Sequence, residues 1–131
     1  METNLELYEN WLKNNGLIYD FDNDGDLHFK YQMCNFYILN PKTDSQFLHI
    51  ILPNIWNIES HEERINALEV ANKLNMGRKA LKAFLTDSNV FLSVEMFIDN
   101  TPDIEDFMER LLDILIEGRQ IFAQEMHQKQ G

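Results

Sequence analysis

The sequence predicts an α+β fold in which an antiparallel sheet of about five strands packs with three helices, in the order α-β-β-β-α-β-β-α. Three observations support this prediction. Three segments begin with helix-capping patterns, the segments between them alternate apolar and polar residues, and short turn-forming stretches separate the alternating segments. The chain has 131 residues with no repeat and no linker, so we expect a single domain over residues 1–131.

Capping patterns mark where the three helices begin. Two of the starts have the spacing of a capping box, and the third combines an N-cap with a proline and an acid in the first turn. They are Thr3 with Glu6, Ser60 with Glu63, and Thr101 followed by Pro102 and Asp103. The apolar spacing predicts that the first helix ends near Asn15, before Gly16, and the second near Asn75, before Gly77.

Each predicted helix has one apolar face. The third helix is the longest, and its apolar stripe is wide. The stripes consist of Leu5, Tyr8 and Leu12 in the first helix, Ile65, Leu68 and Leu74 in the second, and Ile104, Phe107, Met108, Leu111, Leu112, Leu115, Phe122 and Met126 in the third.

The stretch DFDNDGDL, which starts at Asp20, is similar to the start of a calcium-binding loop because acids alternate before a glycine in the sixth position. Position 12 is Tyr31, however, where such a loop needs a bidentate Glu, and the intervening residues alternate as in a strand. We therefore expect no metal site but a hairpin, in which a short extra strand within residues 17–22 pairs with the next strand. Asp22 then lies opposite Asp26, and Gly25 takes a left-handed conformation.

Two further hairpins follow from the same alternation, one across the sequence PKTDS and one with a two-residue turn at Ser88 and Asn89. The predicted pairs are Asn40 with Gln46, Ile38 with Leu48 and Phe36 with Ile50 in the former, and Leu85 with Leu92, Ala83 with Val94, Leu81 with Met96 and Lys82 with Glu95 in the latter. Both hairpins place their apolar residues on the same face as Leu27 and Phe29.

The opposite face of the sheet, which we call the reverse face, is more apolar than a solvated face of an antiparallel sheet usually is. Two explanations remain open. Either the second helix or the start of the third covers this face, or a partner does, which would be a second copy of the chain or a peptide. The residues of this candidate binding or dimer face are Tyr37, Leu39, Phe47, His49, Ile51, Phe84, Phe91 and Phe97.

The chain carries 11 basic and 22 acidic residues, a formal net charge of -11, which disfavours binding to nucleic acid. One segment differs, because no acid occurs from residue 70 to residue 86 while four cations do: Lys73, Arg78, Lys79 and Lys82. These cations either end a helix and line a solvated strand, or they form a basic docking patch for an acidic partner.

The single cysteine, Cys34, excludes an internal disulfide, and the first residues lack the apolar run of a signal peptide. No segment approaches the roughly 20 apolar residues of a membrane helix. We therefore expect a cytoplasmic protein without membrane contact.

Motifs for catalysis or cofactor binding are not found in the sequence. His61 and Glu62 are followed by Ile65, where the zinc-protease motif needs a second histidine. Phosphate loops, dinucleotide fingerprints and nucleophile motifs are absent from the sequence. We expect no catalytic residues and no cofactor.

The succession GLIYDFDNDGDLHFKY, NFYILN, FLHIILPNIW, NKLNMGRKALKAFL and NVFLSVEMFI, followed by an acidic helix, resembles the YbjN family, whose fold is similar to that of type III secretion chaperones. The resemblance extends from about Leu5 to Met126. It implies a small, acidic, cytoplasmic and non-enzymatic module, often dimeric, which in the chaperone relatives holds an extended peptide on apolar patches. No catalytic residue is carried over.

The first hypothesis for function is therefore a non-enzymatic protein-binding module, a chaperone-like holder of a peptide segment or partner protein that forms a homodimer. The alternative is a regulatory or sensor domain that binds a small ligand, suggested by the mixture of Tyr, His and Phe along the strands. An enzyme with a dispersed site is the third hypothesis, and it would need histidines and carboxylates that converge in one cleft.

Overall fold

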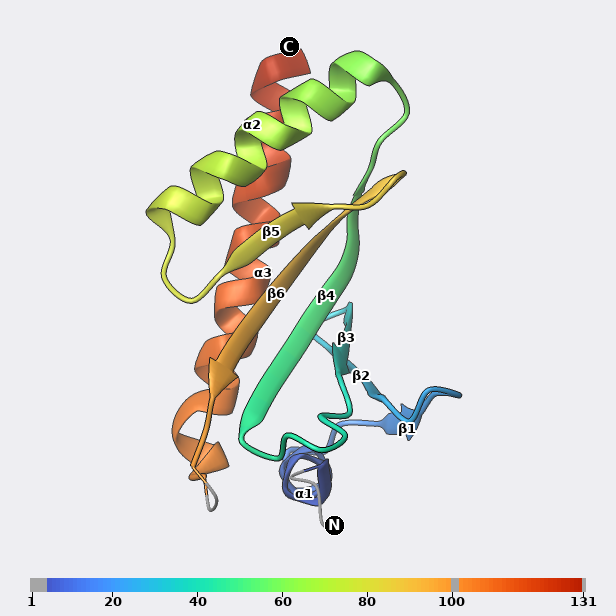
Figure 1. Cartoon of the computed structure of the whole chain (residues 1–131), viewed down its shortest axis with the longest axis vertical. Coiled ribbons are helices and arrows are strands. Elements are labelled where there is room, and N and C mark those ends of the chain that lie inside the picture. Colours follow the sequence, from blue (N-terminus) through green and yellow to red (C-terminus); the bar gives the residue numbers. More distant parts are fainter. Residues whose placement is uncertain (1–4, 100–101, 131) are drawn as a thin grey trace.

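A computed structural model describes residues 5–99 and 102–130, and the structural statements here concern those residues. The elements follow one another as α1 (Leu5–Asn14), β1 (Tyr19–Phe21), β2 (Leu27–Tyr31), β3 (Cys34–Ile38), β4 (Phe47–Asn57), α2 (His61–Gly77), β5 (Lys82–Leu85), β6 (Asn89–Phe97) and α3 (Ile104–Gln130) (Figure 1). The α+β class is confirmed, and β1 is the short extra strand expected within residues 17–22.

The six strands form one antiparallel sheet in the order β1-β2-β3-β4-β6-β5. In Figure 1, α3 runs behind β5 and β6, α2 lies beside the β5 edge, and α1 lies at the lower end. The 27 residues of α3 span about 40 Å at about 1.5 Å per residue, so this helix follows the length of the sheet. The sheet face toward α3 supplies the core through fully buried residues such as Phe29, Phe36, Ile50 and Leu92.

The start of α2 is confirmed as a capped helix end. The Ser60 hydroxyl accepts a hydrogen bond from the Glu63 backbone N–H at 3.0 Å. The Glu63 carboxylate does not complete the capping box, because it accepts instead from Trp56 Nε1 at 2.6 Å. The caps predicted at Thr3 and Thr101 lie outside the described residues.

The apolar face predicted for α2 is partly wrong. Ile65 and Leu68 are 45% and 50% exposed, and the helix continues through Gly77 rather than ending near Asn75. Its buried face has four residues, two of which are alanines that allow α2 to approach α3 and β5 closely. These residues are Ala67, Val70, Ala71 and Leu74.

The first hairpin has the predicted geometry. The Asp22 N–H donates to the Asp26 carbonyl at 2.9 Å, and Gly25 has a φ of +81°. The Asp22 carboxylate also accepts from the backbone N–H groups of Asp24 and Asp26, each at 2.9 Å. The first two of these aspartates are therefore solvated turn formers.

Both longer hairpins differ from the predicted register by two residues. Ile38 pairs with Ile50 rather than with Leu48, and Ala83 pairs with Leu92 rather than with Val94. A shift by two keeps every side chain on its predicted face, so the apolar pattern cannot distinguish the two registers. Local bonding decides between them, as the turn between β5 and β6 shows.

The turn between β5 and β6 is centred on Asp87 and Ser88 rather than on Ser88 and Asn89. The Thr86 N–H donates to the Asn89 carbonyl at 2.8 Å, and the Asn89 N–H donates to the Thr86 hydroxyl at 3.1 Å. These bonds bracket the turn one residue earlier than predicted. In the resulting register Lys82 lies opposite Ser93 and reaches Glu95 diagonally.

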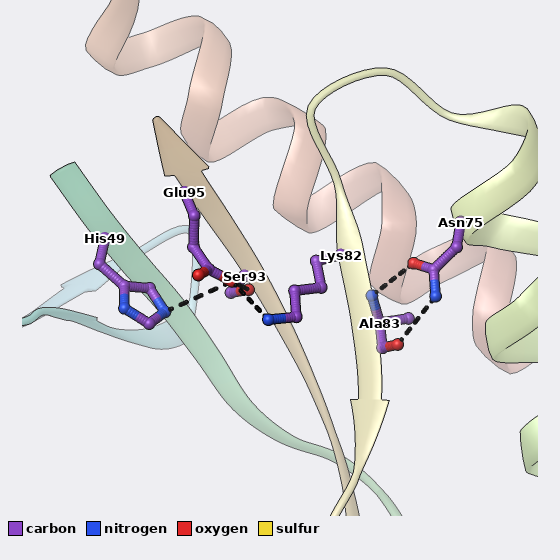
Figure 2. A network of polar contacts seen from close by, with 6 residues as sticks. All are labelled: His49, Asn75, Lys82, Ala83, Ser93 and Glu95. Carbon is purple, nitrogen blue, oxygen red and sulfur yellow. Dashed lines mark hydrogen bonds and ion pairs between the residues drawn. The ribbon is translucent and has the colours of Figure 1, made fainter. Parts of the chain in front are cut away.

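The outer edge of β5 is covered by one side chain of α2. Asn75 Oδ1 accepts from the Ala83 backbone N–H at 2.7 Å, and Asn75 Nδ2 donates to the Ala83 carbonyl at 3.1 Å (Figure 2). The amide thus forms the pair of hydrogen bonds that a neighbouring strand would form.

None of the helices in the described residues combines the length and hydrophobicity needed to cross a bilayer. The cytoplasmic location stays a prediction.

Candidate functional site

The reverse face of the sheet has no helix over it in the described part of the chain. In Figure 1, no helix lies in front of β4 or β6, while α3 runs on the far side. Of the eight predicted residues of this face, seven are half-buried and Phe97 is 79% exposed, whereas most of their neighbours on the core face are buried. The prediction that the second helix or the start of the third helix covers the reverse face is therefore wrong within the described residues. These helices pack on the core face or at the β5 edge.

Aromatic side chains gather at two places on the reverse face. At one end, the rings of Phe47 and Phe97 lie 5.7 Å apart on paired strands. At the β5 side, the rings of Phe84 and Phe91 lie 5.5 Å apart, and the Lys82 ammonium stands 5.6 Å from the centre of the Phe84 ring. The reverse face therefore offers two apolar contact regions with a polar strip between them.

The polar strip contains His49 on β4, Ser93 and Glu95 on β6, and Lys82 on β5 (Figure 2). Lys82 Nζ lies 3.0 Å from Glu95 Oε2, and the Ser93 hydroxyl donates to the same oxygen at 3.1 Å. Ser93 is fully buried although no helix covers it, because its short side chain stands between its longer cross-strand partners Ile51 and Lys82.

The two titratable groups of the strip have shifted pKa values. Burial lowers the pKa of His49, and nearby Lys82 lowers it further, although Glu95 and Asp26 oppose this shift. Burial raises the pKa of Glu95, but the hydrogen bonds from Lys82 and Ser93 and the attraction of His49 outweigh it, so the net shift is downward. At neutral pH the strip therefore holds an ionised carboxylate and a neutral imidazole.

His49 Nε2 lies 3.9 Å from Glu95 Oε2, a distance within the limit for an ion pair but too long for a hydrogen bond. Within the described residues this buried nitrogen has no hydrogen-bond partner. Because burial keeps the ring neutral, we treat the contact as weak rather than as a salt bridge. The polar strip therefore contains one buried nitrogen that forms no hydrogen bond among the described residues.

The four cations of the predicted basic docking patch lie on different elements, and three face carboxylates. Lys73 pairs with Glu125 at 2.9 Å, Lys82 with Glu95 at 3.0 Å, and Arg78 with Glu117. Lys79 is exposed and has no ion pair in the described part of the chain. The patch stays a prediction, and an acidic partner would compete with these carboxylates.

Among the described residues, Asp22, Asp24 and Asp26 bring carboxylate oxygens within 4.8 Å of one another. Asp22 is engaged by two backbone N–H groups, and Asp26 accepts from the Asn40 backbone N–H at 2.7 Å. These bonds account for the cluster as turn structure.

Sequence reasoning found the apolar members of the reverse face but did not name Ser93 or Glu95 as members of the candidate site. Both follow from the same alternation, since they occupy the odd-numbered positions between Phe91 and Phe97 on β6. Alternation therefore placed both residues on the reverse face. It did not mark them as site residues, because polar residues on an outward face are usually only solvated.

The fold and the site define an α+β module in which helices cover one face of a six-stranded sheet and leave the other uncovered. Neither the known protein families nor the curated proteins include a match to this sequence. Solved structures do match.

The chain has a YbjN-like fold. It is similar to YbjN of E. coli, a candidate transcription regulator, with a TM-score of 0.65 and 11% identity over 95% of this chain and 93% of that one. It is also similar to an uncharacterised protein of Methanothermobacter thermautotrophicus, with a TM-score of 0.68 and 14% identity over 96% and 98% of the two chains. Neither is named as an enzyme. At these identities the likeness concerns the fold alone.

Proposed function

We propose that the chain is a non-enzymatic protein-binding module whose reverse face binds a second copy of the chain. The observation that carries this proposal is that the reverse face is apolar and uncovered. Residues such as Phe47, Phe91 and Ile51 belong to no part of the buried core, although an outward sheet face normally carries polar residues there.

Charge favours a second copy as the occupant. A net charge of -11 opposes self-association over most of the surface. On the reverse face, however, Lys82 balances Glu95 at 3.0 Å, and His28 faces Asp20 at 2.9 Å. Two copies can therefore approach through this face without net repulsion, and each presents the same apolar regions to the other.

The size of the face also suits a dimer. The strands have between three and eleven residues, at about 3.3 Å per residue and about 4.8 Å between neighbouring strands. The resulting area of roughly 600 Å² per copy approaches the ~800 Å² per partner of a standard interface. An extended peptide client, as held by chaperones, would use only part of it.

The test measures the solution mass by light scattering and analytical ultracentrifugation over a range of protein concentrations. We expect a dimer that Phe97→Glu weakens, because the substitution places a charge in the apolar contact. Met76→Glu is the matched control, since Met76 is 80% exposed on α2 and Phe97 is 79% exposed. Both side chains are so exposed that neither change should prevent folding.

A second pair of variants tests the role of charge balance. Lys82→Glu and Lys79→Glu each make the net charge more negative by two, but only the former leaves Glu95 beside a second carboxylate on the reverse face. We expect dissociation for Lys82→Glu alone. A monomeric wild-type chain, or equal effects of the two substitutions, would refute the second copy as occupant. A monomer that binds extended peptides through the same residues would instead identify a client-holding function.

A further inference from the structure

A cleft of about 460 Å³ opens where β3 and β4 separate. Pairing between these strands ends at Tyr37 and Ile51. In the same register the next hydrogen-bonded pair would join Asn35 to Pro53, which has no N–H to donate. Beyond this point Asn54 has a φ of +56°, and β4 is irregular. The proline therefore ends the ladder and creates the cleft.

The charge of the cleft is opposite to that of the whole chain. None of its nine lining residues is acidic, although the chain has 22 acids. Arg119 of α3 lines the cleft and has no ion pair with any described residue, whereas Arg78 and Lys73 do have such partners. An unpaired guanidinium presents donors in a fork that fits a carboxylate or a phosphate.

A histidine with two polar partners stands at the edge of the cleft. His28 Nδ1 lies 2.9 Å from Asp20 Oδ1, and His28 Nε2 lies 2.9 Å from Asn35 Oδ1. Which ring nitrogen donates depends on the tautomer, and the Asp20 carboxylate balances the charge that the ring carries when it is protonated. The hydrogen bond to Asn35 raises the pKa of His28, and Asp20 adds to this effect although burial opposes it.

Asn35 contributes donors rather than acceptors to the cleft. Its side-chain oxygen faces His28, so its NH₂ group is directed elsewhere. Its backbone N–H points toward β4, because alternate residues of a strand point the same way and Leu39 donates its N–H to His49. Tyr37 and Leu52 supply an apolar wall. The cleft thus combines the Arg119 guanidinium and N–H donors with apolar surface.

We propose that this cleft binds a small organic or inorganic anion through a phosphate or carboxylate group. Arg119 pairs with the oxyanion, and Asn35 donates to it. The volume lies in the range of small-molecule sites, about 300–1,000 Å³. This site would give the chain a ligand-sensing function in addition to protein binding.

The test is a titration followed by ¹H–¹⁵N NMR at pH 6, at constant ionic strength set with sodium chloride. Sodium phosphate and sodium benzoate serve as the two probes. We expect saturable shifts of the Asn35 and Arg119 signals with at least one probe. Two protein concentrations are used so that self-association through the reverse face can be separated from anion binding.

Arg119→Gln should weaken binding about tenfold or more, as expected for loss of a charged hydrogen-bonding partner. Arg110→Gln is the matched control, because Arg110 is also exposed on α3 but lies outside the cleft. Asn35→Asp keeps an oxygen for His28 but adds a carboxylate, so binding should be lost.

Binding of phosphate alone, or of benzoate alone, supports the site and identifies which oxyanion it takes. Binding of both supports the shared oxyanion chemistry. The proposal is overturned if neither probe gives a saturable shift, if Arg119→Gln binds as the wild type does, or if the two arginine variants lose affinity equally.

Discussion

Asn75 should stabilise the sheet through its two hydrogen bonds to the backbone of Ala83. Each such bond contributes about 1 kcal/mol net, and the two are half-buried with lengths of 2.7 and 3.1 Å. Alanine regains a few tenths of a kcal/mol through its helix propensity. We therefore expect Asn75→Ala to lower the free energy of unfolding by about 1.5–2 kcal/mol.

The unfolding entropy, which scales with chain length, relates this loss of free energy to a change in melting temperature. At about 2.1 cal/mol/K per residue, 131 residues have an unfolding entropy of about 0.28 kcal/mol/K, so the melting temperature should fall by about 6 °C. Urea denaturation and calorimetry measure the two quantities. Hydrogen exchange at the Ala83 amide locates the effect, since this N–H loses its acceptor.

Two variants make the test specific. Asn72→Ala, on the same helix, loses only a contact of its amide with Met76 sulfur at 3.5 Å and should change stability by less than about 0.5 kcal/mol. Asn75→Asp retains an acceptor for the Ala83 N–H but sets a carboxylate oxygen against the Ala83 carbonyl. Its cost should therefore decrease when the introduced carboxyl is protonated at low pH. Equal stability of Asn75→Ala and Asn72→Ala would refute the reasoning.

Three further changes have defined outcomes. Ser60→Ala should cost about 1 kcal/mol in urea denaturation, because the Glu63 N–H loses its cap, and an unchanged midpoint would contradict this role. Gly25→Ala should cost about 1–2 kcal/mol, since the φ of +81° is strained for a residue with a Cβ; an increase in stability would exclude such strain. For His49 the folded pKa is lowered, so the unfolded chain binds the proton first. The free energy of unfolding of the wild type, measured relative to that of His49→Gln, should therefore be constant above pH 6.5 and should decrease as the pH falls below 6.5. A difference between the two proteins that does not change with pH would show that burial does not lower the pKa of His49.

The sequence predicted which side chains share a face, because alternation is a local property of each strand. Phe29, Ile38 and Val94 are buried as expected, and Phe47 and Phe91 lie on the opposite face. The order of elements could be predicted for the same reason, since each helix and turn has its own local signal.

The register could not be predicted from alternation, because a shift by two residues leaves the pattern unchanged. Thr86 and Asn89 decide it through bonds to each other, which a count of apolar residues does not reveal. The exposed Ile65 and Leu68 show a related limit. The contact face of α2 includes two alanines, which a search for large apolar residues does not select.

For the candidate site, the reverse face could be predicted but the cleft could not. Pro53 was a visible signal, since a proline within a strand removes a ladder donor. Its effect depends on which residue it faces, and the predicted register would have placed it opposite a different position of β3. The approach of Arg119, far away in the sequence, requires the packing of α3 and has no local signature.

The two borders of the sheet are unequally available to a strand of another molecule. At β5 the amide of Asn75 already occupies the outward backbone groups of Ala83, whereas β1 is a bare three-residue border beside the exposed Ile18. If two molecules were to join border to border, contact through β1 would need no change, whereas contact through β5 would have to displace the Asn75 amide from Ala83. Asn75 therefore makes the β5 border less available for strand-by-strand growth than the β1 border.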